Sequence, residues 1–445
     1  MKMKHYIRRF AILPLVIVLL CGSFVFGYAG NDLIHGHWRE AERSGTRLVK
    51  DILNTTGVNG SNNTEPYQLM RETLGVIQKD MYGPAVTQAK ERKLVYAGIS
   101  GMLATLNDPF TSFLDPQEWQ SMQQTTRGDF EGIGAVLQQK GSDVVIVQPF
   151  TGSPAAKAGL KPGDIIIRVN GRSTIGVNID QVVKWIKGPR NTVVTLTIMR
   201  KGQRLTKKLV RALVQPPVVT SWMTGDKIGY IRLDEFNEQS DPQFDAALHH
   251  LEQKGMRALI FDLRYNPGGL LNVAINVASH FIKSGPIVII QERGGVHEDL
   301  MARPEYYVHR HFPLVVLVNG SSASASEIVS GAIKDDHVGT LIGEHTFGKA
   351  LVQTLYPLND GSALRLTTAR YLTPNGHNIN NKYDAEGRMI FGTGGVHPNI
   401  VVKQSPKWLD MDWSDKKDDT QLQAALKFLR EKLQQRTAST SPAAK

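Results

Sequence analysis

From residue 216 onward, short apolar runs alternate with longer stretches of helical periodicity, and this alternation limits the possible folds more than any other feature. Four runs rich in branched aliphatic residues are predicted to be buried strands, at 228–233, 258–263, 287–290 and 314–318. Helical patterns lie between them, at 241–254, 272–283 and 325–334. Strands that alternate with helices usually pair into a parallel sheet with helices on its faces. We therefore predict an α/β domain over 214–402.

The sequence pattern changes at residue 128, where short segments rich in β-branched residues are separated by turns that contain glycine and proline. The predicted strands are 135–137, 144–147, 165–169 and 193–199, which indicates a small antiparallel β domain. Within it, small residues at 153–158 lead into Gly-Leu-Lys-Pro-Gly-Asp (159–164), and the next strand ends in Asn170-Gly171. In these motifs the segment 128–213 resembles a PDZ domain.

The PDZ resemblance gives a role to a glycine-rich loop at the start of this segment. Gly132, Ile133 and Gly134 stand where PDZ domains place the backbone amides that bind a peptide's terminal carboxylate. The expected partners are therefore protein substrates with apolar or unstructured C-termini. The alternative is that the two glycines only form a tight turn, because glycine pairs are common in turns.

The N-terminal segment has the charge asymmetry of an export signal or a membrane anchor. An apolar stretch from Phe10 to Tyr28 follows basic residues at positions 2, 4, 8 and 9. Its length is close to the ~20 residues that cross a bilayer. We expect a membrane anchor at 10–29, a cytoplasmic flank at 1–9 and an extracytoplasmic catalytic part. A cleaved signal, which would release a secreted protein, is the alternative; a lipoprotein at Cys21 is less favoured because Leu20 precedes it.

Length, charge and cysteine content exclude several classes of protein. With 445 residues, the chain is long enough for two or more folded units. Its single cysteine, Cys21, excludes an intrachain disulfide framework and a zinc site built from cysteines. The formal net charge is +11, of which the basic residues beside the apolar stretch supply four. No aromatic-basic motif accompanies the remaining charge, so we expect no nucleic-acid binding.

The remaining segments are predicted to be a linker and helices. Residues 30–65 contain a run of turn formers and are expected to be a linker. Helical spacing predicts an N-terminal helical region at 66–127, with helices at 67–81 and 87–106, and an amphipathic helix at 422–433 within a C-terminal tail, 403–445. The apolar faces of these helices lack obvious partners, so we expect a homodimer that forms through them.

The stretch that follows the strand at 314–318 is the most informative about chemistry. Residues 319–327 (Asn-Gly-Ser-Ser-Ala-Ser-Ala-Ser-Glu) form a turn of small residues that enters the next helix. Such a strand, turn and helix expose one side chain and point helix N–H groups toward whatever binds there. A serine in this turn is a candidate nucleophile, and the alternative is that the serines only cap the helix.

A nucleophilic serine needs a base, and the histidines offer no obvious partner. Lys349 is the candidate, because it lies between apolar Phe347 and Leu351 and burial would lower its pKa toward neutrality. The stretch from Gly343 to Lys349 also nearly matches a phosphate-binding loop. Ala350 replaces the hydroxyl that would hold magnesium, and a strand is predicted at 352–358 where a helix is required, so we reject a nucleotide site.

Three motifs, in this order, resemble those of the carboxyl-terminal processing (tail-specific) serine peptidases. They are Asp-Leu-Arg-Tyr-Asn-Pro-Gly-Gly (262–269), Ser-Ala-Ser-Ala-Ser-Glu (322–327), and Thr-Phe-Gly-Lys (346–349) with a glutamine four residues after the lysine. The similarity spans about 66–402. It implies an α/β fold: a crotonase-like serine peptidase core with an inserted, β-rich PDZ domain, a helical N-terminal arm and a C-terminal helix.

The family resemblance also implies roles for individual residues. Ser324 would be the nucleophile, Lys349 the general base, and Gln353 the residue that orients Lys349. The backbone amides of Gly268 and Ala325 would be the oxyanion donors. All of these groups come from protein, so no metal or organic cofactor is expected.

Three further positions bear on how closely the chain follows the family. Asp335, after the nucleophile helix, matches an acidic position expected to support the structure of the site. Ala350 stands where glycine normally follows the lysine, and would be strained if that position needs a positive φ. His397-Pro398-Asn399 replaces the more usual His/Lys-Pro-Asp. Neither departure touches the reacting groups.

The sequence thus predicts a membrane-associated serine endopeptidase that recognises protein C-termini through its PDZ domain and cleaves near them. Because the PDZ domain is inserted beside the catalytic body, we expect its occupancy to gate cleavage. The alternative is a catalytically silent PDZ scaffold of the same fold. That alternative predicts a damaged site, whereas Ser324, Lys349 and Gln353 are all present.

Overall fold

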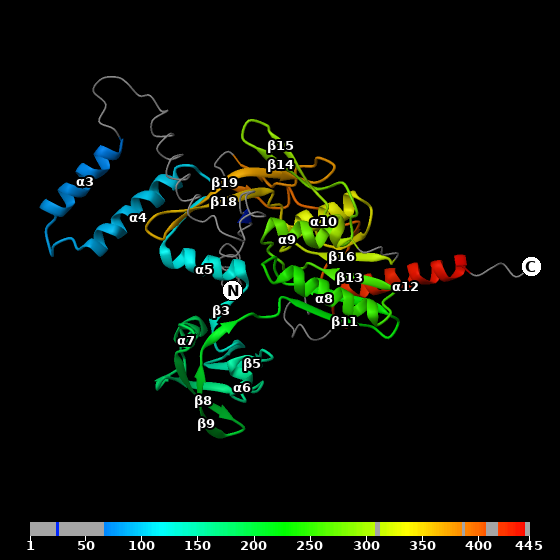
Figure 1. Ribbon diagram of the computed structural model, residues 1–445, viewed down its shortest axis with the longest axis horizontal. Coiled ribbons are helices and arrows are strands. Elements are labelled where there is room, and N and C mark those ends of the chain that lie inside the picture. The colour runs from blue at the N-terminus through cyan, green and yellow to red at the C-terminus, as the bar shows by residue number, and fades with distance from the viewer. Residues whose placement is uncertain (1–23, 26–65, 308–311, 385–387, 406–416, 441–445) are drawn as a thin grey trace, which may run out of the picture. The chain divides into compact units, whose positions relative to one another are not determined.

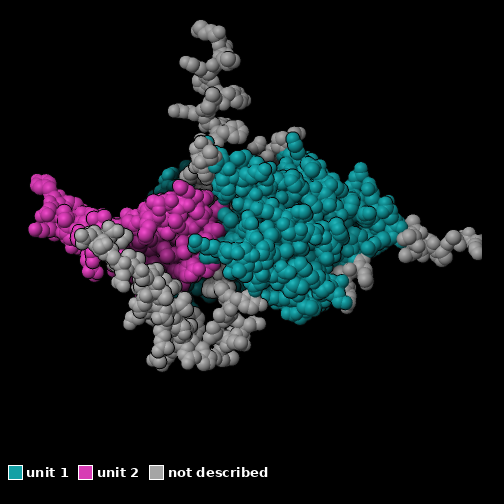
Figure 2. Space-filling model, turned by 90° about the horizontal axis from the view of Figure 1, so that it is seen from above, with its two compact units in different colours: residues 1–23, 120–352, 368–445 teal, residues 24–119, 353–367 magenta. Residues whose placement is uncertain are grey.

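The computed structural model describes residues 24–25, 66–307, 312–384, 388–405 and 417–440. The chain divides into two compact units, which are coloured separately in Figure 2. The first unit contains residues 1–23, 120–352 and 368–445, and the second contains 24–119 and 353–367. Both units are therefore discontinuous in sequence, and each is considered by itself below.

A mostly parallel sheet lies at the centre of the first unit. Its strands, in spatial order, are β11 (Val219–Met223), β12 (Ile228–Leu233), β13 (Ala258–Asp262), β16 (Leu314–Val318), β17 (Thr340–Gly343) and β22 (Ile400–Val401). Only β11 runs antiparallel to its neighbour. Every residue of β13 and β16 is buried, which is why these strands appear in the sequence as continuous apolar runs.

Helices cover both faces of this sheet (Figure 1). They are α8 (Ser240–Gln253), α9 (Leu271–Ser279), α10 (Ala325–Asp335) and α12 (Thr420–Thr440). Ile260 of β13 packs in one cluster with Leu429 of α12, while the next residue, Phe261, contacts Phe244 of α8. Because neighbouring side chains of a strand point to opposite faces, α12 and α8 lie on opposite sides of the sheet.

The apolar face of α12 is covered by the chain itself. Five of its residues are buried against the sheet, namely Leu422, Ala425, Leu426, Leu429 and Leu433. We expected this face to be free for a second copy of the chain, and that part of the expectation is wrong. Burial of such a face stabilises the core by about 25 cal/mol per Å² of apolar surface removed from water, so α12 is an integral part of the first unit.

The predicted strand at 287–290 belongs to a different sheet from the other three. It is β14 (Pro286–Glu292), which pairs antiparallel with β15 (His297–Met301) and with residues 369–372 of β19 (Ala363–Leu372). Three of the four residues in its apolar run 287–290 are buried, so hydrophobic periodicity alone did not separate this strand from the parallel strands. A 3₁₀ turn, η1 (Pro304–Tyr306), and the pair β20 (Lys382–Tyr383) and β21 (Met389–Ile390) complete this region.

The segment 128–213 forms the small β domain that the sequence predicts. Its sheet has the order β4 (Ala135–Lys140), β5 (Asp143–Pro149), β6 (Ile165–Val169), β8 (Val193–Arg200) and β9 (Gln203–Val210), with β7 (Arg172–Ser173) beside β6. Two helices, α6 (Pro154–Lys157) and α7 (Ile179–Ile186), pack on it. The strand that enters the domain, β3 (Phe130–Gly132), pairs with the strand that leaves it, β10 (Ala212–Val214).

The second unit contains the N-terminal helices α3 (Pro66–Asp80) and α4 (Gln88–Ala104), close to the predicted bounds. Its strands are β1 (Phe24–Val25), β2 (Ser112–Leu114), part of β18 (Leu351–Pro357) and the start of β19. No residue of α4 is buried. Helix α5 (Pro116–Arg127) joins the two units in sequence.

The expected localisation in a membrane is wrong by the structure. Among the helices in the described ranges, none combines the length and the apolar character needed to cross a bilayer. Most of the segment 10–29 lies outside the described residues, and its two described residues, Phe24 and Val25, form β1.

Candidate active site

Ser324 lies where the turn after β16 enters α10, and its backbone has an unusual conformation. Its φ is 56° and its ψ is −113°, a combination that residues with a side chain rarely adopt. The turn is fixed from outside, because Asn319 Oδ1 accepts from the Tyr265 amide at 3.0 Å and Ser322 Oγ donates to the Leu263 carbonyl at 2.8 Å. Strained backbone of this kind persists only where the surroundings over-determine it, and it is concentrated at functional sites.

The Ser324 hydroxyl is buried and has no hydrogen-bond partner among the described residues. An unsatisfied buried hydroxyl normally costs about 1–3 kcal/mol. The same residue immediately precedes α10, where Ala325 is the first helical residue. The amide groups at a helix N-terminus attract negative charge. The hydroxyl thus lies at the N-terminal end of α10, where the helix amides favour negative charge.

Glu327 joins the nucleophile turn to the lysine segment, and sequence reasoning did not single it out. Its Oε2 accepts from the backbone amides of Ser324 at 2.8 Å and Lys349 at 2.9 Å. Its Oε1 accepts from Thr346 Oγ1 and from the Gly348 amide, both at 2.6 Å. One fully buried carboxylate therefore receives four hydrogen bonds from two segments that are more than 20 residues apart. The sequence signal was the glutamate that ends the serine motif.

The environment of Glu327 predicts a pH-dependent stability. Burial raises the pKa of its carboxyl group from 4.5 to about 7, against the four hydrogen bonds, which lower it. A carboxyl pKa that is higher in the folded state favours folding most below pH 4.5, and this contribution is lost as the pH rises through about 7. Between these limits, we expect the wild-type free energy of unfolding to fall by roughly 3 kcal/mol relative to Glu327→Gln.

Chemical denaturation of both proteins at several pH values measures this difference. Glu327→Gln also replaces an acceptor oxygen by an amide that faces two donors, so it should be less stable than wild type at pH 7 and above. Parallel pH profiles for the two proteins would contradict the assignment of the pKa to Glu327.

Tyr371 is a second buried contact between the same two segments. Its hydroxyl lies 3.1 Å from the Ser324 carbonyl oxygen and also contacts the carbonyl of Lys349. Burial, together with the negative charge of Glu327, raises the pKa of Tyr371 well above its usual value, so the phenol stays neutral and can donate. Nothing in the alternating pattern of its strand distinguishes Tyr371 from its neighbours, so the sequence gives no signal for this contact.

Lys349 is fully buried, between β17 and β18. Its segment is fixed against the nucleophile turn, because the Phe347 amide donates to the Ser322 carbonyl at 3.0 Å. Burial in general disfavours the charged form of an amine, and the neutral amine is the form that can accept a proton. The structure therefore brings the segments of the predicted nucleophile and base together within one compact unit.

Gln353 is the first residue of the part of β18 that belongs to the second unit. Its side chain is 1% exposed, and its Nε2 donates to Thr367 Oγ1 at 3.4 Å. Its Oε1 has no hydrogen-bond partner among the described residues. The predicted role of Gln353 in orienting Lys349 stays a prediction.

Gly268 approaches the nucleophile more closely than any other residue type could. Its φ is +101°, and a Cβ at this position would lie 2.8 Å from Ser324 Cβ and 2.7 Å from the Ala323 carbonyl oxygen. The Gly268 amide donates to Asn266 Oδ1 at 2.9 Å. To act as an oxyanion donor, the Gly268 amide would have to break its hydrogen bond to Asn266 Oδ1 and donate to the substrate oxygen instead.

The positions that depart from the family pattern fit their surroundings. Ala350 is buried and is not among the residues with a positive φ, so the alanine is not strained in the way that we considered. Asn399 Oδ1 accepts from the Leu341 amide at 2.8 Å, an acceptor role that an aspartate would also fill. Asp335 lies at the far end of the 11-residue α10, roughly 16 Å along the helix from Ser324, and accepts from the Asn375 amide at 3.0 Å.

The predicted peptide-binding loop lies directly before β4, an edge strand of the PDZ sheet. Gly134 has φ +74°, and a Cβ there would lie 2.5 Å from Ser153 Cβ, so only glycine fits. Ile133 is buried, and its carbonyl accepts from the Ala155 amide at 2.8 Å.

Within the described part of the chain, no three His, Cys, Asp or Glu side chains gather in a way that could hold a metal ion.

Comparisons with known proteins define the class of this chain. Residues 227–402 match the model of peptidase family S41, and residues 125–200 match a PDZ domain model. A structure of an S41 protease from Bacteroides fragilis, 18% identical, superposes with a TM-score of 0.50 over 84% of this chain and 99% of that one. The fold is therefore that of an S41 peptidase that carries a PDZ domain.

Curated relatives give the family. A carboxyl-terminal-processing protease of Synechocystis sp. is 37% identical over 348 residues, which cover 76% of this chain and 78% of that protein. The carboxy-terminal processing protease CtpA of Bacillus subtilis is 36% identical over 350 residues, which cover 77% and 71%. The chain belongs to the carboxyl-terminal processing protease family, and it is a serine protease of that family.

Proposed function

We propose that this protein is an endopeptidase that uses Ser324 as nucleophile and Lys349 as general base to cleave proteins near a C-terminus bound by the PDZ domain. The observation that carries the proposal is the Ser324 hydroxyl: it is buried, it has no partner among the described side chains, and it lies on strained backbone at the start of α10. Through Glu327, the amide of the same residue is fixed relative to the amide of Lys349.

In the first half of the proposed reaction, Lys349 Nζ takes the proton of Ser324 Oγ as the oxygen attacks the carbonyl carbon of the scissile peptide bond. The tetrahedral oxyanion is stabilised by the amides of Ala325 and Gly268, and each such donor contributes ~3 kcal/mol in other hydrolases. The intermediate then collapses to an acyl-enzyme. The C–N bond breaks, and the leaving amine takes the proton from Lys349.

In the second half, Lys349 acts as base again, toward water. The water oxygen attacks the acyl carbon, its proton passes to Lys349 Nζ, and the second tetrahedral intermediate expels Ser324 Oγ, which recovers a proton. Gln353 is proposed to orient the amine through its side-chain amide. The net reaction is hydrolysis of one peptide bond.

We propose that the substrate C-terminus pairs with β4 and that its carboxylate binds at Gly132, Ile133 and Gly134. An edge strand can accept a peptide as an added strand, and backbone amides just before that strand can capture a terminal carboxylate. Val136 of β4 is 42% exposed and offers an apolar contact to such a peptide. These features favour an apolar, unstructured tail as ligand.

A substrate with a blocked terminus tests this proposal. We expect amidation of the C-terminus of a partly unfolded, apolar-tailed protein to lower kcat/KM by about 10- to 100-fold. The amide has no negative charge and one acceptor oxygen fewer, so the backbone donors of the loop bind it more weakly. Gly134→Ala should abolish the preference for a free carboxylate. Gly141→Ala is the control, since Gly141 also has a positive φ but no atom lies within 4 Å of its Cβ position. If the Ser324→Ala protein gives the same cleavage products as wild type, the proposed function is wrong.

The PDZ domain is also proposed to gate the active site. The chain enters the PDZ domain through β3 and leaves it through β10, and these two strands pair with each other. The domain is therefore joined to the catalytic body by one two-stranded connection. A ligand that binds one arrangement of such a domain better than another shifts the equilibrium between them. Deleting residues 128–213 should then raise the cleavage rate of a short unstructured peptide. A deletion variant that folds but does not cleave would contradict gating.

We further propose a homodimer that forms through the N-terminal helices. Several large apolar side chains of α3, α4 and their flanks are exposed by more than half, namely Tyr67, Leu69, Val76, Tyr82, Met102 and Leu106. Exposed apolar surface of this kind marks protein interaction sites. Light scattering on the full chain, and on a variant with Leu69 and Val76 changed to Ser, decides between a dimer and a monomer.

A further inference from the structure

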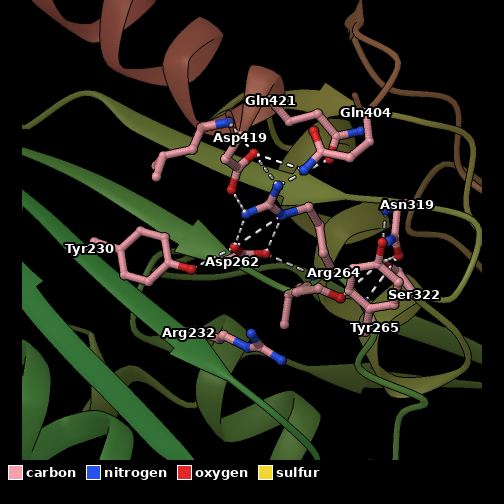
Figure 3. A network of polar contacts seen from close by, with 12 residues as sticks. Tyr230, Arg232, Asp262, Arg264, Tyr265, Asn319, Ser322, Gln404, Asp419 and Gln421 are labelled. Carbon is pink, nitrogen blue, oxygen red and sulfur yellow. Dashed lines mark hydrogen bonds and ion pairs between the residues drawn. The ribbon is translucent and has the colours of Figure 1, made fainter. Parts of the chain in front are cut away.

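A buried network of charged side chains lies behind the turn that carries Gly268, and Figure 3 shows it from close by. Arg264 is at its centre and is 4% exposed. Its Nη1 and Nη2 groups donate to the two carboxylate oxygens of Asp419, at 2.7 and 2.8 Å. Its Nη2 and Nε groups donate to Asp262, at 2.6 and 3.0 Å. Two carboxylates therefore bind two adjacent edges of one guanidinium.

The two carboxylates come from parts of the chain that are 157 residues apart in numbering. Asp262 ends β13, and it also accepts from the Arg264 amide at 2.9 Å and from the Tyr230 hydroxyl at 2.6 Å. Asp419 immediately precedes α12 and accepts from the Leu422 amide at 3.0 Å, as an N-cap residue does. The fork of Arg264 thus joins the end of a core strand to the start of the C-terminal helix.

The turn that follows Arg264 reaches the nucleophile. Tyr265 has φ +61°, and the carbonyl of Asn266 accepts from the Ala323 amide at 3.1 Å and from Ser326 Oγ at 2.9 Å. Gly268 then lies against Ser324, as the space around its Cβ position shows. Gly268 is only four positions after Arg264 in the sequence. The position of Arg264 therefore bears on where the turn places Gly268 against Ser324.

We propose that Asp419 is a positioning residue for the peptidase reaction, acting through Arg264 to fix the turn 265–269 against Ser324. This inference rests on the proposed function. It makes the start of α12 part of the catalytic apparatus, because a bidentate pair between a guanidinium and a carboxylate fixes geometry as well as charge. Asp262 binds the Nε and Nη2 edge of the guanidinium, and Asp419 binds the Nη1 and Nη2 edge with the second negative charge.

The test is Asp419→Asn in the full chain. Asparagine still caps α12, but it cannot form a charged bidentate pair with Arg264. We expect kcat for an apolar-tailed protein substrate to fall roughly 10- to 100-fold with KM little changed, since misplacement of a catalytic turn by about 1 Å costs this much. Reaction of Ser324 with a fluorophosphonate should slow in parallel. Asp419→Glu, which keeps the charge, should recover part of the loss.

Leu429→Ala is the matched control. Leu429 is fully buried in α12, and its aliphatic side chain forms no hydrogen bond with the charged groups, so its truncation loosens the packing of the helix without removing a hydrogen bond from the network. It should lower the Tm while kcat stays within about 2-fold of wild type. An Asp419→Asn protein with wild-type kcat, or a Leu429→Ala protein that loses kcat to the same extent at the same Tm, would overturn the proposal.

Two further measurements keep the outcome decisive. Gln421 Oε1 also accepts from the Nη1 group of Arg264, at 3.2 Å. Gln421→Ala should therefore lower kcat less than Asp419→Asn does. It replaces Asp419→Asn in the test if that variant cannot be obtained folded. Hydrogen exchange of the peptide that covers 263–270 should be faster in Asp419→Asn than in Leu429→Ala. Equal exchange rates in the two variants would contradict the positioning role of Asp419. If wild type itself shows no cleavage that depends on Ser324, the proposed function fails, while the exchange result still decides the positioning role.

Discussion

Ser324→Ala is expected to lower kcat for peptide cleavage by about 10⁵- to 10⁶-fold, to the level left by binding and oxyanion stabilisation alone. The substitution removes only the oxygen that attacks the substrate. That oxygen has no hydrogen-bond partner among the described residues, so its loss leaves no donor or acceptor unsatisfied there. The Tm should therefore stay close to that of wild type. Steady-state cleavage of an apolar-tailed protein, read by mass spectrometry, measures the effect.

Lys349→Met tests whether serine and lysine act as one unit. Methionine has a similar volume and no amine, so it fills the buried position without a base. We expect a loss comparable to that of Ser324→Ala, and a double variant that is no worse than either single one, because residues of one catalytic unit are not additive. Ser321→Ala, in the same turn, is the control and should keep kcat within about 2-fold. Losses that multiply in the double variant would show that Lys349 does not act on Ser324.

Gly268→Ala is also expected to have a large effect, although it changes neither the nucleophile nor the base. The added methyl group would lie 2.8 Å from Ser324 Cβ and 2.9 Å from the Ala325 amide nitrogen, which is closer than non-bonded atoms approach. The turn or the nucleophile must move, so both the attack and the oxyanion contact are lost. We expect kcat to fall at least about 10²- to 10³-fold, as when an oxyanion donor is removed.

Gly285→Ala separates this clash from backbone strain. Gly285 has φ +98°, nearly the φ of +101° at Gly268, but no atom lies within 4 Å of its Cβ position. Both variants therefore carry a similar cost of placing alanine at a positive φ, and only Gly268→Ala disturbs Ser324. We expect Gly285→Ala to lower the Tm and leave kcat unchanged. Equal kcat values for the two variants would mean that Gly268 has no part in the active site.

Local pattern was sufficient for most individual elements of the fold. Strands β12, β13 and β16 and helices α8 and α10 lie within a few residues of their predicted bounds, because each is long enough to repeat its own period. The same patterns did not specify partners. The apolar run of β14 was grouped with the parallel strands although it pairs with β15 and β19, and the apolar face of α12 was expected to contact a second copy although the central sheet covers it.

The candidate site shows the same division. Ser324 was predicted as nucleophile from the resemblance of a short contiguous motif to the family, and Lys349 was predicted as base from its apolar neighbours and the same resemblance. Glu327 and Tyr371, which contact the backbones of both residues, gave little or no signal, because their importance lies in hydrogen bonds to segments distant in sequence. The expected membrane-spanning segment lies mostly outside the described residues, and no helix within them is long and apolar enough to cross a bilayer.

The sequence by itself determined the order of the motifs, the family they resemble, and the residue types available for chemistry, because these are properties of contiguous stretches. Only the tertiary structure decided that the Ser324 hydroxyl is buried with no partner among the described residues, that one carboxylate joins the serine and lysine segments, and that Asp419 binds Arg264 next to the glycine turn. Glu327 is 22 positions from Lys349, and Arg264 is 155 positions from Asp419. The chain closes such distances through the packing of its whole core, which no local period encodes.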